Sequence, residues 1–342
     1  MHAAMKPSFR HLAIRTALEA LAATTTAAGI RSKAHHSVIF TLHHVRPASG
    51  EPFDPNAHLS VTPEFLDIAI RECLACGFTP VALADLPRRL EAEPDGRFVS
   101  FTLDDGYRDN RDHAATVFRR HGVPYTIFLT KGFAQRTSTI WWETAEKAIR
   151  AIDAWAIDGR AFDCRTISGK RRAYRYTACM VEKAADECRA VEIVDAEAAR
   201  SGVSPVEIVQ ELVMDEDELA AFAKSEPLAH FGVHTLTHRI MSKLSPDTIQ
   251  QEIADCAEWI GALIGERPTT IAYPYGYDWA CGIREAEAAA AAGLSVGVRT
   301  TPGKITGAPS ELLLLPRVSL NGFYQQRRFV RALLSGRMMK SA

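Results

Sequence analysis

Short runs of apolar and β-branched residues alternate along the chain with longer segments in which apolar residues recur at helical spacing. The strand-like runs cover 37–42, 97–103, 124–130, 269–274, 294–298 and 311–320. The helical patterns cover 62–77, 112–122, 245–265, 284–293 and 322–334. This alternation predicts a parallel sheet or barrel. A chain of 342 residues is long enough for a (β/α) barrel of about 250 residues with additions.

Two of the predicted helices carry local start and stop signals. Thr62 is a capping residue followed by Pro63 in the first turn, and Gly77 is expected to end that helix. Ser245 and Pro246 give the same signal at the start of the 245–265 segment. These boundaries are therefore predicted from the sequence alone.

The alternation breaks between about residues 138 and 228, where the chain is charged and strand signals are weak. We interpret this region as a helical insertion. The predicted organisation is an N-terminal helical extension at 1–35, a barrel at 36–322 that carries the insertion, and a C-terminal helix at 323–342. The predicted fold class is α/β, a (β/α) barrel with a helical insertion.

Composition and charge exclude some classes of protein and partner. The net charge is −1 at pH 7, so no basic excess supports nucleic-acid binding. The seven cysteines are an odd number and, apart from Cys73 and Cys76, are scattered along the chain, a usage typical of reduced thiols in the cytoplasm. Glu19 interrupts the apolar stretch near the N-terminus, and no apolar run is long enough to span a membrane. We expect a cytoplasmic protein and leave peripheral association with a membrane open.

Two adjacent carboxylates, Asp104 and Asp105, directly follow the predicted strand at 97–103, and Gly106 comes next. Functional groups of a parallel barrel lie at the carboxyl ends of its strands. Two neighbouring carboxylates coexist there if a metal ion neutralises one and the other acts as a base. The alternative is a pair of helix-capping residues, since aspartate is common in front of helices.

His234 and His238 are four residues apart in the stretch HTLTH. Residues at this spacing share one face of a helix, so both imidazoles can bind one ion. Thr235 occupies the position of the general-base glutamate of zinc proteases, which excludes that class. Such a spacing alone is a weak signal, and its combination with the carboxylate pair makes it informative.

A third stretch, IAYPYGYDW at 271–279, ends a predicted strand with Pro274 and Gly276 and carries several aromatic residues. Aromatic rings beside a polar cleft commonly stack on sugar faces, and the alternative is ordinary packing of a loop. Trp141 and Trp142 in the insertion raise the same choice between sugar stacking and core packing.

In this order, TLDDG, HTLTH and YPYG resemble the motifs of the polysaccharide deacetylase family, carbohydrate esterase family four, which shares the NodB homology domain. The resemblance covers roughly residues 36–320 and implies a distorted (β/α) barrel. It implies that Asp105, His234 and His238 bind one divalent metal ion, usually zinc, and that Asp104 is the general base. It also implies that the Tyr275 amide, which follows Pro274, helps form an oxyanion hole.

Two departures from the family pattern concern the site. The family arginine two residues before the motif proline is replaced by Ala272, and Arg299 or Arg317 is expected to orient the base instead. The late histidine that supplies the general acid is also missing. His43, at the end of the first predicted strand, is our candidate for the acid; the alternative is a histidine that merely caps the strand.

The resemblance implies a metal-dependent hydrolase, similar to chitooligosaccharide deacetylases, that removes N-acetyl groups from amino sugars. Its partner would be a carbohydrate carrying N-acetyl amino sugars, in an oligosaccharide, a polysaccharide or a bacterial envelope glycan precursor. One alternative is a deformylase or amidase acting on a lipid-linked amino sugar or a non-sugar amide. Another is a degenerate barrel that binds glycan without turnover. No feature favours a purely structural protein.

Overall fold

The computed structural model describes residues 9–25, 29–30, 36–305 and 307–337. Its core is a nine-stranded parallel sheet in the order β12-β11-β10-β9-β6-β5-β1-β13, with β4 paired to β5. The strands are β1 (Val38–Leu42), β4 (Thr79–Pro80), β5 (Phe98–Leu103), β6 (Tyr125–Leu129), β9 (Ala229–Val233), β10 (Thr270–Ala272), β11 (Val296–Arg299), β12 (Leu315–Pro316) and β13 (Val318–Ser319). The apolar runs predicted from the sequence thus form one parallel sheet.

The sheet curves into a nearly closed barrel because the last segment of the chain pairs with a strand on each side of the opening. Leu315 of β12 pairs with Val298 of β11, and Val318 of β13, three residues later, pairs with Phe40 of β1. The predicted single strand at 311–320 is therefore two short strands, which bridge the barrel. Arg317 lies between them and is fully buried.

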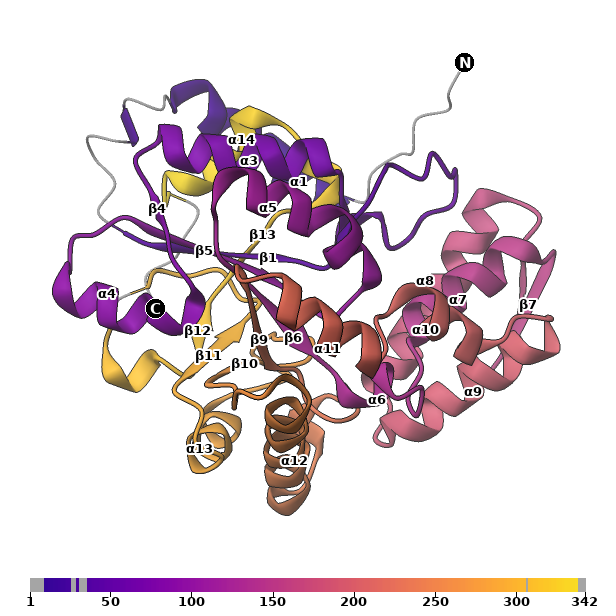
Figure 1. Ribbon diagram of the computed structural model, residues 1–342. Helices are drawn as coiled ribbons and strands as arrows, with labels where there is room; N and C mark the ends of the chain where they lie inside the picture. Colours follow the sequence, from indigo (N-terminus) through magenta and orange to yellow (C-terminus); the bar gives the residue numbers. More distant parts are fainter. Residues whose placement is uncertain (1–8, 26–28, 31–35, 306, 338–342) are drawn as a thin grey trace.

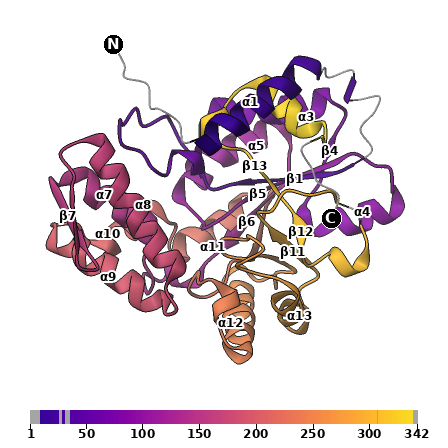
Figure 2. The same cartoon turned by 180° about the vertical axis from the view of Figure 1, so that it is seen from behind.

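Helices cover the outside of the barrel (Figures 1 and 2). Helices α3 (Pro63–Ala75), α5 (Ala115–His121) and α14 (Arg327–Leu334) lie along one side, and α1 (Phe9–Thr24) packs on α14. Helices α11 (Glu216–Ser225), α12 (Pro246–Ile264) and α13 (Ile283–Ala291) lie side by side further around the barrel. The short helices α4 (Leu86–Ala92) and α6 (Lys131–Ala134) follow β4 and β6.

The predicted start and stop signals are confirmed. The Thr62 hydroxyl accepts a hydrogen bond from the Phe65 amide at the start of α3, and Ser245 caps α12 in the same way. Gly77 has a φ of 81° just beyond the end of α3. Such signals are readable from sequence because they act through local hydrogen bonds and backbone conformation.

The region between β6 and β9 forms a lobe beside the barrel, drawn in pink in Figure 1. It contains α7 (Trp141–Ala151), the antiparallel hairpin of β7 (Ala154–Ile157) and β8 (Arg160–Asp163), α8 (Ile167–Lys183), α9 (Glu187–Arg200) and α10 (Pro205–Leu212). These elements share a hydrophobic core that includes Trp155, Ala173 and Val194. Helix α11, which follows them, packs on α12 of the barrel layer.

The exact division of the chain into an extension, a barrel and a terminal helix stays a prediction. Parts of the predicted extension, at 1–8, 26–28 and 31–35, and the end of the predicted terminal helix, at 338–342, lie outside the described residues. Within the described residues, no helix is long and apolar enough to cross a bilayer, and every cysteine is a free thiol. The expected cytoplasmic location stays a prediction.

Candidate active site

The residues singled out from the sequence meet at the carboxyl ends of the strands. His43 follows β1, Asp104 and Asp105 follow β5, and His234 follows β9. The stretch with Pro274 and Tyr275 follows β10. Because the strands are parallel, these ends share one rim of the barrel, where functional groups of such folds gather.

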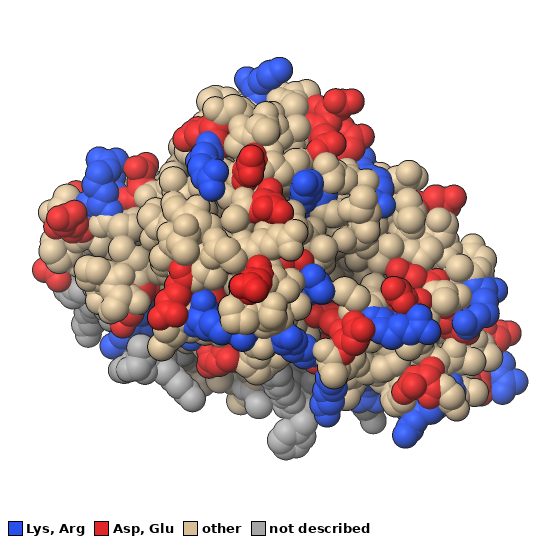
Figure 3. Space-filling view, turned by 90° about the horizontal axis from the view of Figure 1, so that it is seen from below, with Lys and Arg blue, Asp and Glu red and all other residues tan. Residues whose placement is uncertain are grey.

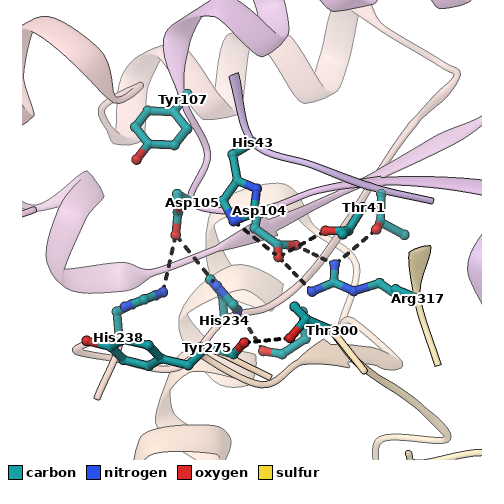
Figure 4. A network of polar contacts seen from close by, with 12 residues as sticks. Thr41, His43, Asp104, Asp105, Tyr107, His234, His238, Tyr275, Thr300 and Arg317 are labelled. Carbon is teal, nitrogen blue, oxygen red and sulfur yellow. Dashed lines mark hydrogen bonds and ion pairs between the residues drawn. The ribbon is translucent and has the colours of Figure 1, made fainter. Parts of the chain in front are cut away.

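Asp105, His234 and His238 form a compact cluster (Figure 4). An oxygen of Asp105 lies 3.6 Å from Nε2 of His234 and 3.5 Å from Nε2 of His238. Asp105 and His234 are almost fully buried, and the side chain of His238 is 10% exposed. One ligand atom from each residue lies within 4.8 Å of the other two, so a single ion can reach all three.

The helical argument for the two histidines is wrong, although the two side chains do meet. His234 and His238 lie on a loop after β9, in which Thr235 and His238 adopt positive φ of 68° and 57°. The Thr235 hydroxyl accepts from the His238 amide. Buried Glu252 of α12 accepts from the amides of Leu236 and Thr237, each at 2.9 Å. A tight loop anchored to α12, rather than a helix face, therefore aligns the imidazoles.

The Asp105 carboxylate is unsatisfied without an ion. Both of its oxygens are buried and lack a hydrogen-bond partner among the described residues. Burial, and then the neighbouring Asp104 carboxylate, raise the pKa of Asp105 well above its usual range. A buried charge persists only when it is paired or binds a metal. The donor set of one carboxylate and two imidazoles fits zinc and leaves a coordination position open.

The tautomer of His234 suits a metal ligand. Its Nδ1 donates a hydrogen bond to the Ala272 carbonyl at 2.6 Å, so the unprotonated Nε2 faces Asp105. Burial lowers the pKa of His234, and that of His238 is lowered further by burial and by its histidine neighbour. Both rings are therefore neutral, which is the form that binds metals.

Asp104 has the opposite environment to Asp105. The Arg317 guanidinium donates two hydrogen bonds of 2.7 Å to Asp104, one to each carboxylate oxygen (Figure 4). Burial alone would raise the pKa of Asp104, but the Arg317 guanidinium, assisted by His234, holds it well below its usual range. Asp104 is thus ionised at neutral pH, directly beside the cluster.

The two arginines expected near Asp104 lie in different places. Arg317 reaches Asp104 from the junction of β12 and β13, and it also donates to the Thr102 hydroxyl at 3.0 Å. Arg299, at the end of β11, donates instead to Asp278 at 2.8 Å. Arg317, and not Arg299, therefore lies beside Asp104.

His43 borders the same carboxylate. Its Nε2 lies 3.9 Å from Asp104, and the side chain is 21% exposed. The Asn110 side chain donates to the His43 carbonyl at 2.8 Å and holds the backbone there. Burial, reinforced by the charges of Arg317 and His234, lowers the pKa of His43 to about 3 despite the attraction of Asp104. The ring is therefore neutral in the metal-free protein.

Tyr275 closes the opposite side of the cluster. Its φ of 61° turns the backbone after buried Pro274, and its ring packs on His238 with centroids 5.5 Å apart. The phenol donates to Glu187 of α9 at 2.7 Å and accepts from the Trp141 indole at 3.1 Å. The insertion thus contributes to the wall of the site.

Trp141 and Trp142 are 6% and 8% exposed, so neither offers a free ring face for a sugar. Trp142 lies 5.0 Å from the His238 ring and donates to the Tyr107 hydroxyl. Their environment agrees with the core-packing interpretation. Both rings line a pocket that also includes His238, between the insertion and the histidine loop.

One buried network was not anticipated from the sequence. Nδ1 of His44 lies 2.5 Å from Asp109, and its Nε2 lies 3.5 Å from Glu143 on α7. His44 is fully buried, and although burial opposes the charge, the two carboxylates raise its pKa to about 9. The only sequence signal was the pair His43–His44, which does not reveal a partner on the distant insertion.

The comparisons with known proteins agree with this geometry. A family model described as polysaccharide deacetylase matches residues 91–163 and 170–296, more than half of the chain. The chain therefore belongs to the polysaccharide deacetylase family. The matched segments contain the carboxylate pair, both histidines and the Tyr275 loop. A search of curated proteins finds no match.

Solved structures of deacetylases resemble the chain in fold. The deacetylase PplD of Streptococcus pyogenes, solved with acetate, is 17% identical with a TM-score of 0.56, and the match covers 84% of this chain and 93% of that one. A polysaccharide deacetylase of Bacillus cereus is 14% identical with a TM-score of 0.54, covering 87% and 69%. IcaB of Ammonifex degensii is 14% identical with a TM-score of 0.51, covering 87% and 97%.

Proposed function

We propose that this protein is a metal-dependent deacetylase that hydrolyses the N-acetyl group of amino sugars in an oligo- or polysaccharide, or in an envelope glycan precursor. One observation carries the proposal. A three-residue cluster able to hold an ion lies directly beside an ionised, arginine-bound aspartate at the functional rim of the barrel. The family supports a carbohydrate substrate and a deacetylation reaction.

Asp105, His234 and His238 would hold one divalent ion, for which zinc is the best match to the donor set. When bound, such an ion lowers the pKa of a water molecule and polarises a carbonyl oxygen. Asp105 gains the positive partner that its buried oxygens lack. The hydrogen bond from His234 to Ala272 keeps Nε2 free for this purpose.

Asp104 is proposed as the general base that accepts a proton from the attacking water. Arg317 keeps the carboxylate ionised and fixes its plane with two hydrogen bonds. Because the pKa of Asp104 is held low, the carboxylate does not retain that proton. The proton is passed on to a neighbouring group.

His43 is proposed to deliver a proton to the departing amine. Its ring is neutral before the reaction, since its pKa is about 3, and its Nε2 lies near Asp104. We infer that His43 gains its proton during the reaction and then acts as the acid. The Tyr275 amide, presented by the turn after Pro274, would stabilise negative charge on the carbonyl oxygen.

The position of Arg317 favours a protein that turns over its substrate, and not one that only binds glycan. The argument for a degenerate barrel rested partly on the missing family arginine. Arg317 supplies an equivalent guanidinium from another strand, and a binding protein needs no oriented base. The acetate complex reported for the Streptococcus pyogenes relative supports an acetyl rather than a formyl group as the one removed.

The test is a comparison of acyl groups with matched variants. N-acetyl and N-formyl glucosamine oligomers are incubated with the zinc-loaded protein, and acetate and formate are measured. We expect acetate release that Asp104→Asn abolishes and that Asp85→Asn, at an exposed position in the turn after β4, leaves intact. Formate release alone would favour the deformylase, and an active Asp104→Asn would contradict the assigned base.

A further inference from the structure

Two large aromatic side chains are exposed on the loop that follows β10. Tyr277 is 45% exposed and Trp279 is 48% exposed. Their rings are nearly parallel, with an interplanar angle of 18° and centroids 5.7 Å apart. Side chains of this size are normally buried, so a rigid pair in water indicates a binding surface. We call Tyr277 and Trp279 the aromatic platform.

The aromatic platform continues directly from the proposed catalytic site. Trp279 packs on Tyr275 with ring centroids 5.8 Å apart, and Tyr275 packs on His238 at 5.5 Å. The row of rings thus runs from the ion-binding cluster outward to solvent. A chain molecule that places one unit at the cluster can lay a following unit on the platform.

The platform is held rigidly by polar contacts. Asp278, between the two rings in sequence, accepts from Arg299 at 2.8 Å and from the Thr301 hydroxyl at 3.0 Å. The Ser242 hydroxyl donates to the Trp279 carbonyl at 2.8 Å, which ties the loop to the histidine segment. This assigns to Arg299 a position at the platform instead of at the base. A pre-formed surface loses little conformational entropy on binding.

A close backbone approach also fixes the start of this loop. Gly276 has a φ of 65°, and a Cβ there would lie 2.6 Å from the Thr300 amide nitrogen. Thr300 in turn donates from its amide to the Gly276 carbonyl and from its hydroxyl to the Tyr275 carbonyl. The turn therefore presents the Tyr275 amide and the two platform rings as one unit.

We propose that Tyr277 and Trp279 form a subsite for a second sugar ring of the glycan, next to the sugar whose acetamido group is hydrolysed. The inference rests on the proposed function and adds the recognition of a chain rather than a single sugar. Flat aromatic faces bordered by polar groups suit the apolar face and the hydroxyls of a sugar. The exposed carboxylate of Asp278, the residue between Tyr277 and Trp279 in sequence, disfavours insertion into a lipid surface and favours a hydroxylated ligand.

The subsite is tested by binding, which does not depend on turnover. The pentamer and the monomer of N-acetylglucosamine are titrated calorimetrically into the Asp104→Asn protein, with and without Tyr277→Ala and Trp279→Ala. We expect the double substitution to weaken pentamer binding by about tenfold or more and monomer binding by less than about twofold. Phenylalanine at both positions should restore pentamer binding, because the ring faces remain. Leu74→Ala, at an exposed residue of α3, is the control.

Each outcome decides the proposal. Pentamer affinity that is unchanged by the double substitution would overturn it, and so would the absence of any pentamer binding. Loss of self-association or of binding to phosphatidylglycerol vesicles, with pentamer affinity unchanged, would assign the platform to a second copy or a membrane instead. The wild-type protein is assayed in parallel for acetate release. Pentamer binding through the platform without acetate release would contradict the proposed reaction and leave the subsite intact.

Discussion

Asp104 and Asp105 are adjacent in the chain and yet have opposite properties. The pKa of Asp104 is held down by Arg317, whereas burial and the neighbouring charge push the pKa of Asp105 up. A pair of titratable groups whose pKa values are driven apart is typical of a site that divides roles between them. Here one carboxylate is paired within the protein, and the other awaits a cation.

Replacement of Arg317 should remove the charge that keeps the base, Asp104, ionised. In Arg317→Met, burial no longer has an opposing charge, so the pKa of Asp104 should rise. Asp104 must be ionised to act, and the variant should therefore lose activity as the pH falls through the raised pKa. We expect kcat to drop by about 100-fold or more near neutrality and to recover partly as the pH rises.

A kcat–pH profile and zinc stoichiometry check this prediction. The Arg317 variant should bind zinc as the wild type does, because Arg317 does not contact the ion-binding cluster. Arg317→Lys should rescue only partly, since lysine keeps the charge and lacks the forked geometry. Arg88→Lys, on an exposed turn of α4, should behave as the wild type. An Arg317→Met profile that matches the wild type would exclude the positioning role.

The roles of His43 as acid and Asp104 as base can be distinguished with two substrates that differ in their leaving groups. An amine leaves only when protonated, whereas the phenolate of an aryl acetate leaves without an acid. We expect His43→Gln to lower acetamide hydrolysis by about 100-fold or more and to retain most aryl acetate hydrolysis. Asp104→Asn should lose both activities. Equal losses on the two substrates in His43→Gln would assign His43 a structural role.

At the level of single residues, the sequence identifies groups more readily than their partners. The carboxylate pair and the histidines were found because they are close in sequence. The choice between Arg299 and Arg317 could not be made, because both lie near the ends of predicted strands and only the closure of the barrel separates them. The aromatic platform was visible in the letters YGYDW as a group of aromatics, but its exposure depends on the surrounding fold.

Elements that rely on local signals were predicted well, and those set by distant contacts were not. The capped starts of α3 and α12 follow from their own residues. The segment LLLLPRVSL resembles one strand, yet it divides into β12 and β13 because two different neighbours pair with its halves. The spacing of His234 and His238 suggested a helix, but positive φ values and Glu252 of α12 hold a loop.

The contact between β2 (His44–Val45) and α7 should make stability depend on pH. The pKa of His44 rises from an ordinary 6.5 to about 9 in the folded state, where Asp109 and Glu143 face it. The folded protein thus binds the extra proton between these values. Its contribution, roughly 3 kcal/mol, is present below pH 6.5 and is lost as the pH rises through about 9.

Denaturant unfolding of the chelator-treated protein at several pH values measures this contribution. His44→Phe should be less stable than the wild type at pH 6.5, because Asp109 and Glu143 are left buried without a cation. The difference in the free energy of unfolding between the variant and the wild type should become smaller toward pH 9 and above. His230→Gln, at an exposed position of β9, should follow the wild type. A pH-independent difference for His44→Phe would contradict a protonated His44.

The barrel was predicted from the sequence, whereas the contacts through which the lobe reaches the site were not. The lobe reaches the site through Glu187, which binds the Tyr275 phenol, and through Glu143, which faces His44. These contacts join residues that are far apart in the chain. The insertion contains many charged residues, and the sequence does not reveal which of them reach the site. On the face shown in Figure 3, basic and acidic side chains are interspersed without a broad patch of one sign.

Metal binding should be visible in the stability of the entire protein. The metal-free wild type contains a buried carboxylate, Asp105, that has no hydrogen-bond partner among the described residues, so Asp105→Asn should raise the melting temperature of the chelated protein. Zinc should raise the melting temperature of the wild type and have little effect on Asp105→Asn. Thermal scans with chelator and with zinc test this. A variant that zinc stabilises as much as the wild type would argue against Asp105 as a ligand.

The central claim is that one ion at Asp105, His234 and His238 enables deacetylation. The most direct measurement is a zinc titration of the metal-stripped protein, with acetate release from N-acetylglucosamine oligomers recorded at each step. We predict that the rate rises in proportion to bound zinc and levels off at about one ion per chain. A protein that binds one zinc ion and releases no acetate, or that is equally active without metal, would contradict the account.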